Sequence, residues 1–249
     1  MLGLFSAYVF LGARQRSWLR QGALILAYHK VGASPSGSRD PYLYVSEAEF
    51  DRQLGSIGKL SQGTTSLDQL APGRIVVSFD DGSATTLGSC LDILARHKVR
   101  AIQFLLPGLL GGRNTWDVAK GDQADALMTE SQVREWLAAG HEIGSHSLTH
   151  RNLRHLSIAD AREEIMGSKK ALEDKFGRPI RHFSYPYGSW NPAVRDVVKE
   201  AGYETASTMR MGFNDAQTPP LELRRLIPLS SRDLVGKVLH RLKRKTAGR

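Results

Sequence analysis

Short apolar runs alternate with segments of helix-like pattern along most of the chain. The first run, Ala23-Leu24-Ile25-Leu26-Ala27-Tyr28, has no charged residue, as is typical of a strand buried on both faces. Such alternation favours a parallel sheet with helices, either open or closed into a barrel. Strand-like runs lie near residues 23–28, 74–79, 100–106, 141–145, 181–185 and 203–207, with a further candidate near 224–229. Helix-like runs lie near residues 46–59, 84–97, 130–139, 158–176, 192–201 and 232–243.

Two of the helix-like runs begin with start signals. Ser46 and Glu49 have the spacing of a capping box, in which each side chain bonds to the backbone of the other residue. Asn191 is followed by Pro192, and proline is favoured at the first helical position. Both signals support the helical interpretation of these runs.

Polar residues follow two of the strand-like runs. Asp80 and Asp81 come directly after one run, and His146 and His150 come after another. In α/β folds the carboxyl ends of strands carry the ligand sites. A catalytic zinc site usually has three protein ligands and an open position for water, and Asp81, His146 and His150 would form such a set. Asp80 could then accept a proton from the water, with Gly82 permitting a sharp turn. An isolated Asp-Asp-Gly is usually a solvated turn, but the pairing of motifs indicates a metal-dependent hydrolase.

These motifs resemble those of a known family. Phe79–Gly82 is similar to the first motif of polysaccharide deacetylases of the NodB-homology type, carbohydrate esterase family 4, and Gly144–His150 is similar to the second. Phe183–Gly188 matches most of the third motif, and its Tyr-Pro-Tyr-Gly ending resembles a subgroup of poly-N-acetylglucosamine deacetylases. The resemblance runs from about Ala23 to about Leu229. It implies an α/β fold, a distorted (β/α) barrel of about seven parallel strands, and metal-dependent removal of N-acetyl groups from amino sugars.

The resemblance also implies a role for individual residues. Asp80 resembles the catalytic base of the family, and Asp81 resembles its metal-binding carboxylate. His146 and His150 resemble the two metal-binding histidines. Zinc is the expected metal, and cobalt or nickel would fit the same ligands. Tyr187 resembles the residue whose backbone N–H stabilises an oxyanion, where charge develops only in the transition state.

Three residues are candidates for contact with a sugar substrate. Pro186 and Tyr187 lie within the third motif. Trp116 lies in a long insertion, Pro107 to Thr129, where an aromatic ring could stack on a sugar face. An ordinary buried tryptophan is the alternative interpretation of Trp116.

The chain departs from the family pattern at two points. Ser184 stands where the family often has an arginine that orients the base, and we propose Arg225 as the replacement partner of Asp80. A solvated arginine at a strand end is the alternative. The family's general acid is a late histidine, but the last histidine here is His240, in a basic tail of helical pattern. His29 is the alternative acid, although it could instead bind substrate or hold a loop.

The length of 249 residues suits one α/β barrel and is too short for a second full domain. We assign residues 23–230 to the deacetylase-like domain, 1–22 to an apolar and basic extension, and 231–249 to a basic C-terminal helix or tail. Cys90 is the single cysteine, so no intrachain disulfide can form, and we expect it to fill the core.

The net charge of +9 indicates proximity to a membrane surface or an anionic polymer, with a solvated tail as the alternative. No signature of a nucleic-acid-binding module is present. The apolar segment Met1–Ala13 is too short to span a bilayer and has no clear cleavable-signal pattern. It could be a peripheral membrane anchor or a helix packed on the barrel. We therefore expect a cytoplasmic or inner-membrane-associated protein.

Three classes of function fit these features. The first is an N-deacetylase of an amino-sugar polysaccharide or its lipid-linked precursor; a deformylase or deacylase of a lipid-linked amino sugar would need nearly the same site. The second is a non-haem iron oxygenase, since two histidines and a carboxylate also hold iron. The third is a catalytically degenerate glycan-binding domain. Asp80 beside the metal ligands favours hydrolysis, because an oxygenase has no evident need for a spare carboxylate.

Overall fold

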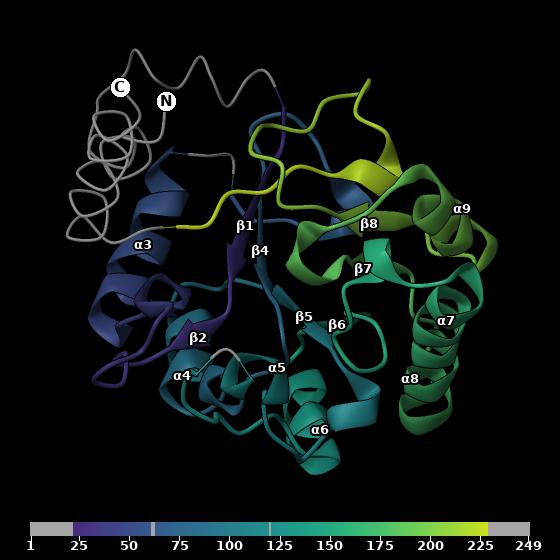
Figure 1. Ribbon diagram of the computed structural model, residues 1–249. Helices are drawn as coiled ribbons and strands as arrows, with labels where there is room; N and C mark the ends of the chain where they lie inside the picture. Colours follow the sequence, from purple (N-terminus) through teal and green to yellow (C-terminus); the bar gives the residue numbers. More distant parts are fainter. Residues whose placement is uncertain (1–21, 61–62, 120, 229–249) are drawn as a thin grey trace, which may run out of the picture.

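The structure of the protein, a computed structural model, describes residues 22–60, 63–119 and 121–228. The predicted N-terminal extension and basic tail, with His240, lie outside these residues. Six parallel strands form the centre of the fold (Figure 1). In spatial order they are β1 (Leu24–Tyr28), β4 (Ile75–Phe79), β5 (Ala101–Leu105), β6 (Glu142–Ser145), β7 (His182–Ser184) and β8 (Thr205–Ser207). Every residue of β1, β4 and β5 is buried, as is typical of a parallel sheet covered by other elements.

An irregular segment connects the two edges of this sheet. Leu223 forms a parallel bridge with Ser207 of β8, and Leu226 forms one with Leu26 of β1. Between these bridges, the N–H of Arg225 donates to a carbonyl of the preceding loop, at 2.9 Å. The seventh strand predicted from the sequence is therefore a bridging segment, because its middle pairs with a loop instead of a strand. The predicted distorted (β/α) barrel is confirmed.

Helices surround the strands on the outside (Figure 1). They are α3 (Glu47–Leu60), α4 (Ser89–Arg96), α5 (Thr115–Val118), α6 (Glu130–Ala138), α7 (Ile158–Arg162), α8 (Ser168–Phe176) and α9 (Pro192–Glu200). The single helix predicted over 84–97 is wrong at its start. Ala84–Thr86 forms a separate 3-10 turn, because Gly88 has a φ of 55° and interrupts the helical path. The run predicted over 158–176 is helical throughout, but a π-helical turn, Glu163–Gly167, joins α7 to α8.

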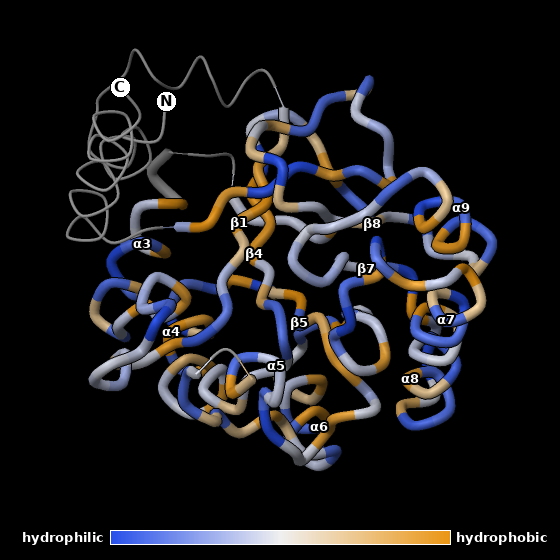
Figure 2. The backbone as a smooth tube through the Cα atoms, viewed as in Figure 1, coloured by the Kyte–Doolittle hydropathy of each residue, from blue (hydrophilic) through white to orange (hydrophobic). Residues whose placement is uncertain are grey.

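The apolar core lies between the strands and these helices, where the strands carry the hydrophobic colours of Figure 2. Phe79 at the end of β4 meets Trp136 of α6 edge to face, with ring centroids 5.8 Å apart. Cys90 is fully buried, as predicted, and burial raises the pKa of its thiol. The predicted cap of α9 is confirmed, since the Asn191 side chain accepts a hydrogen bond from the N–H of Val194 at 2.9 Å. In the described part of the chain, no helix is both long and apolar enough to cross a membrane.

A smaller pair of strands lies beside this sheet. β2 (Lys30–Val31) and β3 (Tyr44–Val45) run parallel to each other. β2 follows β1 after a single residue, His29, so this pair begins where the first strand of the sheet ends.

Candidate active site

The carboxyl ends of neighbouring strands bring the two polar motifs together. Asp80 and Asp81 follow β4, His146 follows β6, and β5 lies between these two strands. The backbone there continues the sheet, because the N–H of Asp80 donates to the carbonyl of Tyr28 at 2.9 Å. The N–H of His146 similarly donates to the carbonyl of Leu105 at 2.8 Å. The sheet thus fixes the positions of both motifs, as expected for an α/β fold.

Left-handed backbone conformations concentrate at this site. Asp81, Ser147, His150 and Tyr187 have φ values of 70°, 70°, 66° and 59°, and they are four of the five described non-glycine residues with positive φ. Gly82, the predicted turn residue, has a φ of 69°. Such conformations cost about 1–3 kcal/mol each at a non-glycine residue and persist only where surrounding contacts enforce them. The strain indicates that these side chains are held for function.

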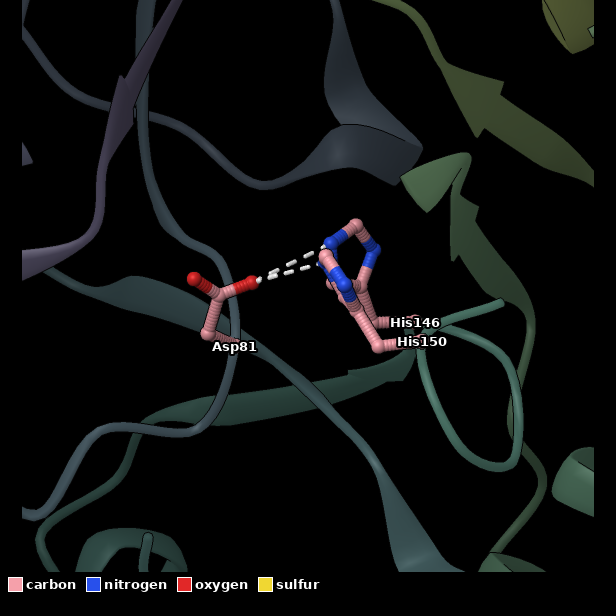
Figure 3. Close-up of side chains that lie close together, drawn as sticks. All are labelled: Asp81, His146 and His150. Atoms are coloured by element: carbon pink, nitrogen blue, oxygen red, sulfur yellow. Dashed lines mark ion pairs between the residues drawn. The ribbon is translucent and has the colours of Figure 1, made fainter. Parts of the chain in front are cut away.

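Three side chains converge on one point (Figure 3). The Nε2 atoms of His146 and His150 lie 3.4 and 3.3 Å from the same carboxylate oxygen of Asp81, and all three side chains are buried. Metal bonds of about 2.0–2.1 Å place neighbouring ligand atoms of a tetrahedral site roughly 3.3 Å apart. Two imidazole nitrogens and one carboxylate oxygen are also donors that zinc, cobalt and nickel accept. The predicted ligand set therefore fits a divalent metal.

A hydrogen bond orients the imidazole of His146 toward that point, and a backbone hydrogen bond fixes the position of His150. Nδ1 of His146 lies 2.7 Å from the backbone carbonyl of Ser184, which can only accept, so Nδ1 carries the proton and Nε2 offers its lone pair. The backbone N–H of His150 donates to the hydroxyl of Ser147 at 3.1 Å, which fixes the backbone at this residue, while Nδ1 of its imidazole has no hydrogen-bond partner among the described residues. Burial opposes the charged form of Asp81, but the imidazoles of His146 and His150 beside the carboxylate outweigh it and hold the pKa of Asp81 well below its usual value.

Arg225 pairs with Asp80, as predicted. Its Nη1 and Nη2 donate to the two carboxylate oxygens at 2.8 and 2.7 Å, and both side chains are buried. Nη2 also donates to the hydroxyl of Ser184 at 3.0 Å, and Nε donates to the carbonyl of Thr208 at 3.0 Å. Burial raises the pKa of Asp80, but the charges of Arg225 and His146 have a larger, opposite effect, so the pKa lies below its usual value. The alternative of a solvated arginine is wrong, while a catalytic role for Arg225 stays a prediction.

His29 lies within the electrostatic field of both aspartates. Burial lowers the pKa of its imidazole, and the charges of Asp81 and Asp80 oppose this shift. Its Nδ1 is buried and has no hydrogen-bond partner among the described residues. Tyr28 pairs with Phe79 in the sheet, so His29 and Asp80 follow at the same ends of neighbouring strands, as predicted. A role of His29 as proton donor stays a prediction.

Two aromatic rings flank the ligand His150. Trp116 stacks on its imidazole with centroids 4.2 Å apart and planes at 27°, and Tyr187 meets it edge-on at 4.6 Å. Trp116 is half-buried and Tyr187 is 43% exposed, so both rings border solvent. Pro186 is buried and starts the turn that carries Tyr187, so its observed contribution is to the backbone there. Contact of these three residues with substrate stays a prediction.

Sequence reasoning missed the charge cluster that anchors the loop bearing Trp116. Lys30 is 3% exposed, and its Nζ lies 2.5 Å from Oδ2 of Asp125 and 3.9 Å from Oδ2 of Asp117. Tyr44 donates its hydroxyl to the same oxygen of Asp125 at 2.5 Å. These contacts join residues 81 to 95 positions apart, and no local pattern in the sequence reveals them.

A second cluster of acidic residues and histidine lies at the opposite end of the sheet, where Glu142 and His182 begin β6 and β7 and Asp68 lies in the 3-10 turn Leu67–Gln69. Asp68, Glu142 and His182 bring potential ligand atoms within 4.8 Å of one another. Both carboxylates already have cationic partners, since Asp68 pairs with Arg181 and Glu142 pairs with Arg100 at 3.1 Å. The first set is therefore the candidate metal site.

Comparison with known proteins agrees with this geometry. A family model described as polysaccharide deacetylase matches residues 68–206, more than half of the chain. This chain belongs to the polysaccharide deacetylase family. The matched segment contains both polar motifs and most of the third motif, so the family resemblance read from the sequence is confirmed.

Individual members of the polysaccharide deacetylase family show the same relationship. The chitin deacetylase of Colletotrichum lindemuthianum is 29% identical over 146 residues, covering 59% of this chain and 54% of that protein. The chitooligosaccharide deacetylase of Azorhizobium caulinodans is 29% identical over 157 residues, covering 62% of this chain and 63% of that protein. The chain thus spans between about half and two thirds of these relatives' length.

A solved structure supports the fold independently. The Streptococcus pyogenes deacetylase PplD, determined in complex with acetate, superposes with a TM-score of 0.71 at 22% identity, over 87% of this chain and 97% of that one. At this level of identity the similarity establishes the fold alone. The chain is therefore a polysaccharide deacetylase family member by sequence and shares the fold of a solved deacetylase.

Proposed function

We propose that this protein is a metal-dependent N-deacetylase acting on an amino-sugar polysaccharide or its lipid-linked precursor. The observation that carries the proposal is the placement of buried Asp80, held by Arg225, next to the convergent set of Asp81, His146 and His150. A base beside a metal site is what amide hydrolysis requires. The amino-sugar substrate is supported by the chitin and chitooligosaccharide deacetylases among its relatives.

Each residue has a distinct task in this proposal. A divalent metal bound by the three ligands would polarise the amide carbonyl and lower the pKa of a water molecule. Asp80 accepts a proton from that water, and Arg225 keeps Asp80 ionised and oriented. As the carbon–oxygen bond forms, the backbone N–H of Tyr187 donates to the developing oxyanion. The carbon–nitrogen bond then breaks, and the imidazolium form of His29 donates a proton to the departing amine. The proton that Asp80 took from the water then restores the imidazolium, so that the net products are the free amine and the carboxylic acid.

The metal content of the purified protein tests the core of this proposal. We expect about one equivalent of zinc, cobalt or nickel per wild-type chain and none in His146→Ala, because two remaining ligands do not complete the site. Elemental analysis of both proteins gives the measurement. A wild-type protein that takes up no metal even after reconstitution would contradict the hydrolytic mechanism, and selective binding of iron would favour the oxygenase alternative.

Hydrolysis assays then distinguish the acyl group. With the metal in place, release of acetate from N-acetylglucosamine oligomers can be compared with release of formate from the N-formyl analogues. We expect faster release of acetate. Preference for the formyl group would instead support a deformylase of a related amino sugar.

The ring of Trp116 supplies a test of the substrate side of the proposal. We expect Trp116→Ala to raise KM for an oligosaccharide roughly fivefold, since loss of an aromatic stacking surface costs about 1 kcal/mol. Steady-state kinetics with oligomers of defined length gives the measurement, together with metal content, because the ring also stacks on His150. Val118→Ala, a change at an exposed position of the same short helix, α5, is the matched control. Unchanged KM in Trp116→Ala would assign the ring to packing alone.

A further inference from the structure

A buried carboxylate lies against the loop that joins the two histidine ligands. Oε2 of Glu164 accepts hydrogen bonds from the backbone N–H groups of Leu148 and Thr149, at 3.0 and 2.9 Å. Its other oxygen, Oε1, accepts from the hydroxyl of Thr149. Glu164 is only 4% exposed, so these loop donors, and not water, satisfy its charge. All three donors lie between His146 and His150.

The helical segment that carries Glu164 and continues into α8 also contacts the chain just before His146. The hydroxyl of Ser168, at the start of α8, lies 2.5 Å from the hydroxyl of Ser145, the last residue of β6. A Cβ atom added at Gly167 would lie 3.8 Å from the side chain of Leu148, so the helix backbone approaches the loop closely. The helix therefore contacts the ligand segment on both sides of His146.

A π-helical turn provides these contacts. Glu164 lies in the π turn Glu163–Gly167, and its neighbour Glu163 is exposed while Ile165 is fully buried. A π turn adds one residue to a helical turn and thereby changes which side chains face inward, and such turns are frequent at functional sites. Here the change in phase directs a carboxylate inward, to two consecutive backbone N–H groups of the loop.

We infer that Glu164 is a positioning residue that holds the loop between His146 and His150 in its metal-binding shape. The inference rests on the proposed metal site. The loop needs such support because Ser147 and His150 both have left-handed backbones, which a free loop would relax. A carboxylate suits the task, since it accepts several bonds at once and its charge strengthens each one.

The affinity for Co²⁺ tests this inference without any substrate. We expect Glu164→Met to weaken Co²⁺ binding about 10–100-fold, the range seen when partners of metal ligands are removed. Glu164→Gln keeps an acceptor for the two N–H groups and can donate to the Thr149 hydroxyl, so it should recover most of the affinity. Glu163→Met, at the exposed neighbour in the same turn, is the matched control and should bind as the wild type does. Competition with a chelator gives the dissociation constants, and the visible Co²⁺ spectrum reports the coordination geometry.

The outcomes separate this inference from the proposed function. A wild type that binds Co²⁺ and a folded Glu164→Met that binds it equally well, with the same spectrum, would overturn the role of Glu164 alone. A wild type that binds no Co²⁺ would overturn both. If Glu164→Met does not fold, Thr149→Val decides, because it removes only the hydroxyl donor. We then expect weaker Co²⁺ binding by the folded variant, and unchanged binding would overturn the inference.

Discussion

Asp80→Asn is expected to lower kcat by about 10²–10⁴-fold, the usual contribution of a general base, while the metal content stays that of the wild type. The carboxamide cannot accept the proton of the attacking water, but Asp80 is not among the three converging ligands. Steady-state hydrolysis and elemental analysis of the same preparation give the measurement. The thermal stability should also fall, because the buried guanidinium of Arg225 loses its counter-charge.

Asp81→Asn is the informative comparison for this change. It alters the neighbouring aspartate, which lies within the ligand set, so it should lose metal as well as activity. If Asp80→Asn instead keeps full deacetylase activity, Asp80 is not the base. If both variants lose metal equally, the division of roles between the two aspartates is wrong.

Arg225→Met is expected to lower the free energy of unfolding by about 3–5 kcal/mol at neutral pH, because it leaves the Asp80 carboxylate buried without a partner. The loss should depend on pH. In the wild type the pKa of Asp80 is lowered, so its pairing stabilises the fold above the usual pKa of an aspartate and is lost as the pH falls through the lowered value. In the variant that pKa rises, so the difference in stability between the two proteins should shrink on acidification. Urea denaturation at several pH values measures it.

Arg225→Met should also shift the pH dependence of catalysis. A higher pKa of Asp80 moves the acid limb of the kcat/KM profile to higher pH, since the base must be ionised to act. Arg224→Met is the matched control, because Arg224 is exposed and a surface change of this kind usually alters stability by less than about 0.5 kcal/mol. An Arg225→Met protein with wild-type stability and an unmoved acid limb would show that the buried pair is dispensable.

Much of the fold could be predicted because the buried strands β1, β4 and β5 are mostly apolar and because strand-like and helix-like runs alternate along the rest of the chain. All six regular strands of the main sheet coincide with predicted runs. The exceptions depend on features that a periodic pattern does not record. Gly88 breaks a helix through its backbone conformation, the π turn lies within a run that is helical on both sides, and the bridging segment differs from a strand only in what its middle residues contact.

The centre of the site was also predictable, because the Asp80–Asp81 pair and His146 directly follow β4 and β6, and His150 comes four residues after His146. Two histidines and a carboxylate are a common ligand set of catalytic zinc. Arg225 could be proposed because Ser184 leaves the usual place of an arginine empty. The supporting contacts could not be predicted. Glu164 and Lys30 look like ordinary charged residues in the sequence, and only their burial reveals that they hold loops.

The bridging segment that connects the edges of the sheet also carries the arginine that pairs with Asp80. These two partners are separated by 145 residues in the chain, an interval that a ribosome translates in roughly 7–30 s. During that time the emerging chain lacks both the bridge between Leu226 and Leu26 and the arginine partner of Asp80. The bridging segment therefore couples two late steps of folding, because the contact that joins the edges of the sheet and the pairing of Asp80 with Arg225 both wait for the same stretch of chain.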